Sequence, residues 1–328
     1  MVATQNGYAP RKDYLANALK QIRDLQNDKM PQWDLIEFDP LLDSSNITVF
    51  EWNKIGSVIY EKYEEYDGFV VLHGTDTMAY TASAISFMLE GLNKPVIFTG
   101  SQIPIGELRS DARENLVTAA LLASMDQCRE VCLYFGGKLL RGNRATKISS
   151  DELVAFDSPN MPKLAIAGID IKFHEDVMLP TQEGPLRMVP FLADVPIAVL
   201  KVFPGIQFSL FEGIMTDKLK GLVLEGFGAG NIPQYDGSLI HIVEKAVQNG
   251  TIIIVCTQCM RGSVQLGAYE TSDALKAAGA LCGYDMTAEA AVAKLYYLFS
   301  KCCTMEEIKT LMETSLRGEL TSKRASEQ

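Results

Sequence analysis

The segment DGFVVLHGTDTMAYTASAISFML, residues 67–89, decides the fold of this 328-residue chain. Residues 68–72 form a short apolar run of strand length, and the polar turn His73-Gly74-Thr75-Asp76-Thr77 follows directly. A helical stretch is expected from about Met78 to Leu89. A fully apolar strand followed by a polar turn and a helix is typical of a parallel sheet that is covered by helices on both faces.

Outward from this segment, apolar runs of strand length alternate with longer helical stretches. This alternation predicts an α/β fold with parallel sheets flanked by helices. Strands are expected at 33–38, 68–72, 95–99, 131–135, 197–202, 221–225 and 251–256. Helices are expected at 13–25, 48–66, 78–89, 107–123, 209–220, 238–248, 287–300 and 305–316.

Between residues 139 and 196 the alternation fades, and proline, glycine and charged residues become frequent. Such a composition is typical of long loops and of an interdomain linker. The chain is therefore expected to hold a larger, catalytic N-terminal α/β domain at 1–176, a linker at 177–195, a smaller C-terminal α/β domain at 196–320 and a tail at 321–328.

The start of the chain is unusual for a doubly wound domain. Its first recognisable features are the turn-like QNGYAP, residues 5–10, and the expected helix at 13–25. A doubly wound domain normally begins with a strand that enters the centre of the sheet. The pattern leaves two readings open: a fold that begins on a helix, or a domain whose N-terminal strand is missing.

Charge and composition argue against several classes of function. A formal net charge of −11 without a basic stripe disfavours nucleic acid and anionic membrane surfaces as partners. No apolar run approaches the roughly 18–20 residues of a membrane span, and the N-terminus has no apolar signal segment. Seven scattered cysteines indicate reduced thiols in the cytosol, and only three histidines disfavour a metal site.

Polar clusters follow three of the expected strands, where parallel sheets bind ligands. In the turn 73–77, a hydroxyl beside a carboxylate can hold a polar ligand or help activate a water, but these residues could equally cap the next helix. Asp43-Ser44-Ser45 could bind an amino or carboxylate group, although taken alone it fits better as an N-cap run. The third cluster is Thr99-Gly100-Ser101-Gln102.

Lys147 ends the segment RGNRATK, residues 141–147, after a fourth expected strand. A lysine acts as a general base only where burial or charged neighbours lower its pKa. With Thr75 and Asp76 it would form a proton-shuttling set, and the alternative is a solvated basic loop.

Two other motifs carry glycines or cysteines at spacings that are typical of functional sites. The run Gly226-Phe227-Gly228-Ala229-Gly230 is not the dinucleotide fingerprint, because Asn231-Ile232-Pro233 follows it in place of a helix. It is interpreted as a functional loop. The pair in Cys256-Thr257-Gln258-Cys259 has redox spacing but ends a strand, so a structural or small-molecule contact is favoured.

Together, DGFVVLHGTDTMAYTASAISFML, KPVIFTGSQIP, ELRSD, RGNRATK, TQCM and the closing SLRGELT resemble the cytosolic type I L-asparaginases. The resemblance runs in register across nearly the whole chain. HGTDTM with the downstream lysine is specific for the asparaginase/glutaminase superfamily, and GSQIP with RGNRATK for its type I branch. The resemblance implies a cytoplasmic enzyme that hydrolyses L-asparagine to L-aspartate and ammonia without a cofactor.

In that family a threonine hydroxyl attacks the side-chain amide and forms a covalent acyl-enzyme that water resolves. The family assembles as homodimers or homotetramers, in which a neighbour's second domain closes each site. The resemblance assigns proton transfer to Thr75, Asp76 and Lys147, and substrate binding to Asp43, Ser44, Ser101, the lid residue Tyr8 and, from the neighbour, Asn231.

The sequence departs from the family pattern in two places. The family opens with a strand that ends in a TGGTIG-like turn, whose last threonine is the nucleophile, and this sequence begins with the methionine that would follow that turn. Thr4 lies on the wrong side of the turn to inherit the role. We therefore expect the first nucleophile and the N-terminal strand to be missing from the printed chain, and the working form to carry an upstream segment.

The second departure is Glu225, which replaces an arginine that binds regulatory asparagine in bacterial type I enzymes. The other expected members of that allosteric site, Thr146, Gln258 and Cys259, are present.

The sequence leaves two alternatives to an L-asparaginase. One is a catalytically silent homologue that binds asparagine or regulates a partner. The other is a relative that acts on a different amide, as in tRNA-dependent amidotransferases, but that branch adds an N-terminal domain and requires contacts with nucleic acid.

Overall fold

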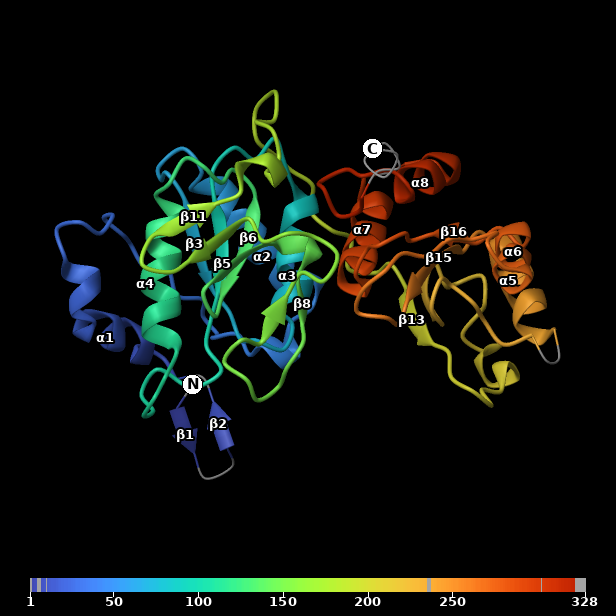
Figure 1. The fold of residues 1–328 in the computed structure, drawn as a ribbon, viewed down its shortest axis with the longest axis horizontal. Coiled ribbons are helices and arrows are strands. Elements are labelled where there is room, and N and C mark those ends of the chain that lie inside the picture. Colours follow the sequence, from blue (N-terminus) through green and yellow to red (C-terminus); the bar gives the residue numbers. More distant parts are fainter. Residues whose placement is uncertain (1, 5–6, 10, 235–236, 302, 322–328) are drawn as a thin grey trace. The chain divides into compact units, whose positions relative to one another are not determined.

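The computed structural model describes residues 2–4, 7–9, 11–234, 237–301 and 303–321, with only the backbone described for 2–4, 7–9 and 238. The chain divides into two compact units, residues 1–188 and 189–328. Each unit is built around its own sheet with helices packed against it (Figure 1). The expected α/β class is therefore confirmed.

The sheet of the first unit has six strands in the order β11-β10-β7-β6-β5-β3. The pairs β3–β5 and β5–β6 are parallel, and the remaining pairs are antiparallel. The strands are β3 (Phe69–Leu72), β5 (Val96–Thr99), β6 (Val131–Phe135), β7 (Lys138–Arg141), β10 (Ala165–Ala167) and β11 (Ile171–Phe173). The parallel half of the sheet carries the polar turns that the sequence singles out.

Two helices of the first unit cover the parallel strands from opposite faces (Figure 1). On one face, Ala119 and Leu122 of α4 pack with Ile97 and Tyr134 of the sheet. On the other, α3 is buried at nearly every residue, as expected for a helix without a polar face. The helices of this unit are α1 (Tyr14–Gln21), α2 (Val49–Glu61), α3 (Met78–Met88) and α4 (Ala112–Ala123).

The start of the chain is a short hairpin in which β1 (Val2–Thr4) pairs with β2 (Gly7–Ala9). Helix α1 follows, so the expected helix at 13–25 is shorter and continues as a 3₁₀ turn at Arg23–Gln26. Strand β2 lies within the stretch 5–10 that the sequence pattern marks as turn-like, and residues 5, 6 and 10 lie outside the described residues.

The strand expected at 33–38 is wrong, because these residues run without a strand partner. Of their apolar side chains, Leu35 packs against the cluster that contains Leu19 of α1 and also contacts Val70 of β3, whereas Trp33 and Ile36 are exposed. The Trp33 Nε1 donates a hydrogen bond to the Leu25 carbonyl at 3.3 Å. The Asp34 Oδ2 accepts one from the Tyr66 hydroxyl at 2.7 Å. Among the described residues β3 is therefore the last strand of its sheet.

Residues 139–196, expected as loops and linker, contribute most of the antiparallel half of the sheet. Strands β7, β10 and β11 have only three or four residues each, which is too short for a periodicity to be read. The segment also holds β8 (Thr146–Lys147), which pairs with β9 (Phe156–Asp157), and β12 (Arg187–Met188), which pairs with β4 (Leu89–Glu90).

The second unit contains a four-stranded parallel sheet in the order β13-β14-β15-β16. Leu222 and Leu224 of β14 join the core that includes Val243 of α5. On the other face, Gly221 lies against Leu295 of α7. The elements are β13 (Ile197–Lys201), β14 (Gly221–Gly226), α5 (Ser238–Gln248), β15 (Ile252–Thr257), α6 (Glu270–Ala277), β16 (Leu281–Cys282), α7 (Ala288–Ser300) and α8 (Met305–Met312).

The helix expected at 209–220 is wrong. This segment has a 3₁₀ turn at Phe208–Phe211, followed by isolated turns. Its apolar residues Phe208, Met215 and Leu219 are buried and imitate a helical pattern, while Gly213 weakens a helix by about 1 kcal/mol relative to alanine. The expected helix at 107–123 starts only at Ala112, after Arg109 takes a positive φ of 62°.

None of the helices in the described ranges is long and apolar enough to cross a membrane.

An ion pair inside the second unit holds the segment that follows α8. The Lys294 Nζ donates to the Met312 and Thr314 carbonyls at 3.1 and 2.6 Å and lies 2.5 Å from Glu319. Both charged side chains are fully buried. Glu319 also accepts hydrogen bonds from the backbone of Leu316 and Arg317.

We expect Lys294→Met to lower the free energy of unfolding by about 3–5 kcal/mol, because it leaves the Glu319 carboxylate buried without its counter-charge. Lys309→Met, which removes an exposed pair with Glu306, is the control and should cost no more than about 1 kcal/mol. Urea denaturation measures both. Equal losses of unfolding free energy in the two variants would show that the buried pair stabilises the fold no more than the exposed pair does.

Candidate active site

The turn between β3 and α3 meets Lys147, which lies on β8. The Lys147 Nζ donates to the Thr75 Oγ1 at 2.9 Å and to the Asp76 Oδ1 at 2.8 Å. The lysine side chain is 23% exposed and the aspartate side chain 63% exposed, so the pair opens to solvent on the aspartate side. One ammonium group thus contacts both a hydroxyl and a carboxylate, an arrangement that can relay a proton between them.

Helix capping does not account for the polar turn 73–77. Thr77 is the N-cap of α3, yet its side chain makes no capping hydrogen bond. Its hydroxyl donates instead to the Ser44 carbonyl at 2.7 Å. The turn therefore serves to fasten a second polar segment, which contains Ser44, beside Thr75 and Asp76.

Ser44 is buried and lies directly against Gly74. A Cβ at Gly74 would lie 2.3 Å from the Ser44 Oγ, so only glycine leaves room for this contact. Ser44 opens a 3₁₀ turn, Ser44–Asn46, that Asp43 caps by accepting from the Ser45 amide at 3.1 Å. The N-cap of α2 is Thr48, which forms a capping box with Glu51. Residues 43–45 therefore do not cap that helix.

The carboxyl end of β5 also lies directly against the turn after β3. The His73 amide donates to the Thr99 carbonyl at 2.9 Å, and a Cβ at Gly100 would lie 2.3 Å from the His73 carbonyl oxygen. Ser101 follows Gly100, so the cluster after β5 lies beside the turn after β3. The structure thus brings the segments of Ser44, Thr75 and Ser101 to one edge of the first sheet.

Two residues hold the loop after β5 and were not singled out from the sequence. Asp111 accepts hydrogen bonds from the Gln102 and Ile103 amides, and Asn115 donates to the Gly100 carbonyl. Both fall inside the helix expected at 107–123, four residues apart, where polar side chains are usually read as the solvent-exposed face of the helix.

The remaining expected site residues lie on β8, in the second unit, or, for one side chain, outside the described residues. Thr146 precedes Lys147 on β8. Asn231 belongs to the second unit, where its Oδ1 accepts from the Thr271 hydroxyl at 2.9 Å. Gln258, also in that unit, donates to the Val202 and Glu225 carbonyls, and Cys259 beside it is exposed. The Tyr8 backbone belongs to β2, but its side chain lies outside the described residues.

His73 is enclosed at the end of β3. Its Nδ1 lies 2.7 Å from the Gly74 carbonyl, so the neutral ring can donate there. The Nε2 is buried and has no partner among the described residues. Burial lowers the pKa of His73 to about 4, against a smaller opposing effect of the Gly74 hydrogen bond. The ring is therefore neutral at physiological pH and does not act as an acid there.

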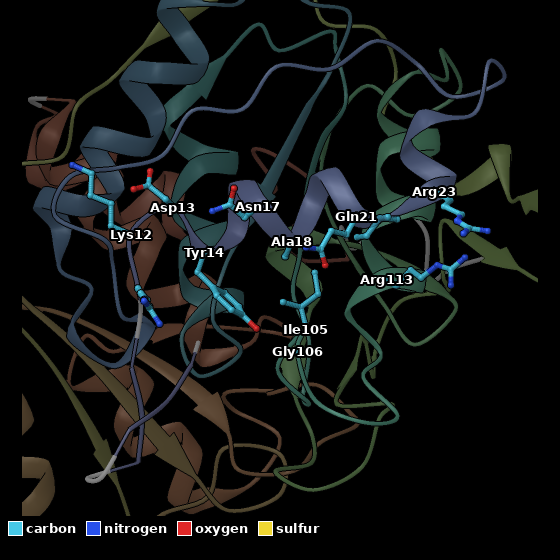
Figure 2. A pocket seen from close by; sticks show the side chains of 12 residues that line it. Lys12, Asp13, Tyr14, Asn17, Ala18, Gln21, Arg23, Ile105, Gly106 and Arg113 are labelled. Atoms are coloured by element: carbon cyan, nitrogen blue, oxygen red, sulfur yellow. The ribbon is translucent and has the colours of Figure 1, made fainter.

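A cavity of about 930 Å³ lies along α1, and the residues of the turn after β3 do not line it (Figure 2). Ile105 and Gly106 of the loop after β5 form one wall, and Tyr14 points toward them. Its basic side chains are exposed, and Lys12 and Arg113 are already paired with Asp39 and Asp24. It is an open surface groove whose charges are partly neutralised.

Across the ranges that the structure describes, no group of three or more histidine, cysteine, aspartate or glutamate side chains could hold a metal ion.

Comparison with known proteins matches both units to family models. Residues 1–179 match the model described as Asparaginase, N-terminal, and residues 196–312 the Glutaminase/Asparaginase C-terminal domain. The chain is 43% identical to L-asparaginase 1 of Escherichia coli K12 over 98% of this chain and 94% of that protein.

Solved structures agree with these matches. The structure of L-asparaginase I from Vibrio cholerae is similar with a TM-score of 0.88 and 41% identity, over 96% of this chain and 95% of that one. A structure named probable cytoplasmic L-asparaginase from Campylobacter jejuni is similar with a TM-score of 0.77 and 25% identity, over 93% of this chain and 94% of that one.

We expect His73→Asn to flatten the loss of stability on acidification. The folded-state pKa of about 4 lies below the usual histidine value of 6.5, so the unfolded chain takes up the proton first. Stability is therefore lost as the pH falls from 6.5 toward 4, by about 3 kcal/mol for this group. Urea denaturation at several pH values measures the slope, with the exposed His241 replaced in the same way as the control. A variant that keeps the wild-type slope would contradict the assignment.

We expect Gly74→Ala to destabilise the first unit by about 1–3 kcal/mol, because the added methyl group collides with Ser44. Gly213→Ala is the control, since nothing lies within 4 Å of a Cβ at that position. Thermal unfolding compares the two variants. If Gly74→Ala is as stable as the control, the close approach to Ser44 does not constrain the turn.

Proposed function

We propose that this chain, which belongs to the asparaginase family, is an amidohydrolase that converts L-asparagine and water to L-aspartate and ammonia. The observation that carries the proposal is the Lys147 ammonium bonded to both Thr75 and Asp76 at the end of a parallel strand. Relatives named L-asparaginase that span nearly the whole chain support the substrate.

In this proposal Thr75, Asp76 and Lys147 move protons during cleavage of the amide. A neutral Lys147 amine can take a proton from the Thr75 hydroxyl and, as the ammonium, give it to the amide nitrogen that leaves as ammonia, while Asp76 accepts a hydrogen bond from Nζ at 2.8 Å. The chemistry is acyl transfer through a threonine hydroxyl. The family resemblance assigns the attack itself to the threonine of a TGGT turn, which has no counterpart by motif in the printed sequence.

Substrate binding is proposed for the groups that surround this set. Asparagine carries an ammonium and a carboxylate, so a site for it needs an acidic group and hydrogen-bond donors close together. Asp43 offers the acidic group, and the hydroxyls of Ser44 and Ser101 offer the donors. The packing of Ser44 against Gly74 supports this role, because it fixes the serine beside Thr75.

Further parts of the proposal rest on the resemblance and on the named relatives. We propose a cytoplasmic protein, as the name of the Campylobacter jejuni structure suggests for that relative. We also propose a homodimer or homotetramer in which Asn231 of one copy and the lid residue Tyr8 complete a site. Regulation by asparagine at Thr146, Gln258 and Cys259 is proposed as well, although Glu225 alters the charge expected there.

L-Asparagine that the purified chain hydrolyses should yield ammonia and L-aspartate in equal amounts. Lys147→Met should lower kcat/KM by about 10²–10⁴-fold, the usual contribution of a positioned acid or base. Lys163→Met is a matched control, because Lys163 is similarly half-buried and also pairs with an aspartate, Asp157, at 3.0 Å. It should keep the wild-type rate.

Calorimetry with L-asparagine separates the possible failures. Binding without release of ammonia would contradict hydrolysis by this chain and favour a silent asparagine-binding protein. Absence of both binding and hydrolysis would overturn the assigned substrate. Equal losses of kcat/KM in the two lysine variants would show that Lys147 has no specific role in the reaction.

A further inference from the structure

The loop from Gly100 to Asp111 connects β5 to α4, and its second residue is Ser101, one of the proposed substrate contacts. A single carboxylate from the far end of this loop shapes its beginning. The Asp111 Oδ2 accepts from the Gln102 amide at 3.1 Å, and the Oδ1 accepts from the Ile103 amide at 3.0 Å. The two amides that directly follow Ser101 are thus tied to one side chain.

Asn115, one turn further along α4, extends this network to the ends of two strands. Its Nδ2 donates to the Asp111 Oδ2 at 3.1 Å and to the Gly100 carbonyl at 3.0 Å, and its Oδ1 accepts from the Gly136 amide at 3.4 Å. Asn115 is only 3% exposed, so these bonds are shielded from water. The carboxyl ends of β5 and β6 are therefore fixed relative to Asp111.

The loop is also held on the side of Lys147. The Gln102 side chain donates to the Glu152 carbonyl at 3.2 Å, in the segment that follows β8. The Ser110 hydroxyl donates to the Ile103 carbonyl at 2.8 Å. The Gly100–Ile103 backbone is consequently restrained by bonds from Asp111, Ser110 and Asn115, and the Gln102 side chain ties the loop to the segment after β8.

The chemistry of these contacts requires an aspartate. All three partners of the Asp111 carboxylate, the Gln102 and Ile103 amides and the Asn115 amide group, are donors, and an ionised carboxylate is an acceptor on both oxygens. An asparagine at 111 would turn a donor toward one of these donors. An asparagine, although similar in shape to an aspartate, therefore cannot make the same three contacts at position 111.

We propose that Asp111 is a positioning residue for substrate binding, which acts by fixing the Gly100–Ile103 backbone so that Ser101 faces the substrate. This inference rests on the proposed function and deepens it. Asp111 touches neither Thr75 nor Lys147 through any hydrogen bond in the described ranges, so its effect is on binding rather than on proton transfer.

The test is Asp111→Asn, with Asp111→Ala as a second variant. We expect the KM for L-asparagine and the calorimetric Kd for L-aspartate to rise about tenfold, the value of one lost hydrogen bond, with kcat within about threefold of wild type. In a Ser101→Ala background the same change at 111 should have little further effect on the Kd, because the two residues act on one contact.

Glu130→Gln is the matched control. Glu130 is a buried carboxylate of the same unit that also accepts a backbone amide, from Leu179 at 3.0 Å, but it precedes β6 and so lies at the opposite end of the strand from the site. It should lower stability and leave the Kd for L-aspartate unchanged. A rise in Kd as large in Glu130→Gln as in Asp111→Asn would reduce the role of Asp111 to general stability and overturn the proposal.

Amide hydrogen exchange gives a readout that does not depend on turnover. In Asp111→Asn, exchange at Gln102 and Ile103 should speed up at least about tenfold, while exchange at Leu133 in the middle of β6 should keep its wild-type rate. If wild type releases no ammonia, the proposed function fails, yet the exchange data still decide whether Asp111 orders the loop. Unchanged exchange at both amides, or an unchanged Kd, would overturn the inference.

Discussion

Close approach of the chain at the carboxyl ends of β3 and β5 is the constraint on which the candidate site depends. At Gly74 and Gly100 a Cβ would lie 2.3 Å from the Ser44 Oγ and the His73 carbonyl oxygen, respectively. Because neither position has room for a side chain, three polar segments can lie against one another. Lys147 then joins them from β8, which belongs to a two-stranded hairpin outside the main sheet.

Much of the fold and of this site could be predicted because the signals are local. Strand β6 (Val131–Phe135) and helix α5 (Ser238–Gln248) have the bounds expected from the sequence, since a short apolar run and an amphipathic repeat are read without knowledge of partners. The turn 73–77 stands out because polar groups directly follow an apolar strand. Its meeting with Lys147, across 72 residues, was suggested by the family resemblance and is given geometry only by the folded chain.

What could not be predicted depends on partners distant in sequence. Residues 33–38 look like a strand, but of their apolar side chains Leu35 packs beside α1, Trp33 and Ile36 are exposed, and their backbone pairs with no strand among the described residues. The strands β7, β10 and β11 are too short to be read alone and exist because each pairs with a neighbour. Asp111 and Asn115 escaped notice for a related reason, since their partners are backbone amides and carbonyls, which carry no sequence signal.

The short strand that holds Lys147 determines how the candidate site responds to heating. Strand β8 has only two residues and two register pairs with β9, whereas β5 and β6 of the six-stranded sheet are fully buried. Segments with few backbone bonds open locally at a lower free-energy cost than a buried core does. Warming would therefore displace the lysine while the sheet and its helices remain intact. The temperature at which the site loses its geometry thus lies below the melting temperature of the unit that carries it.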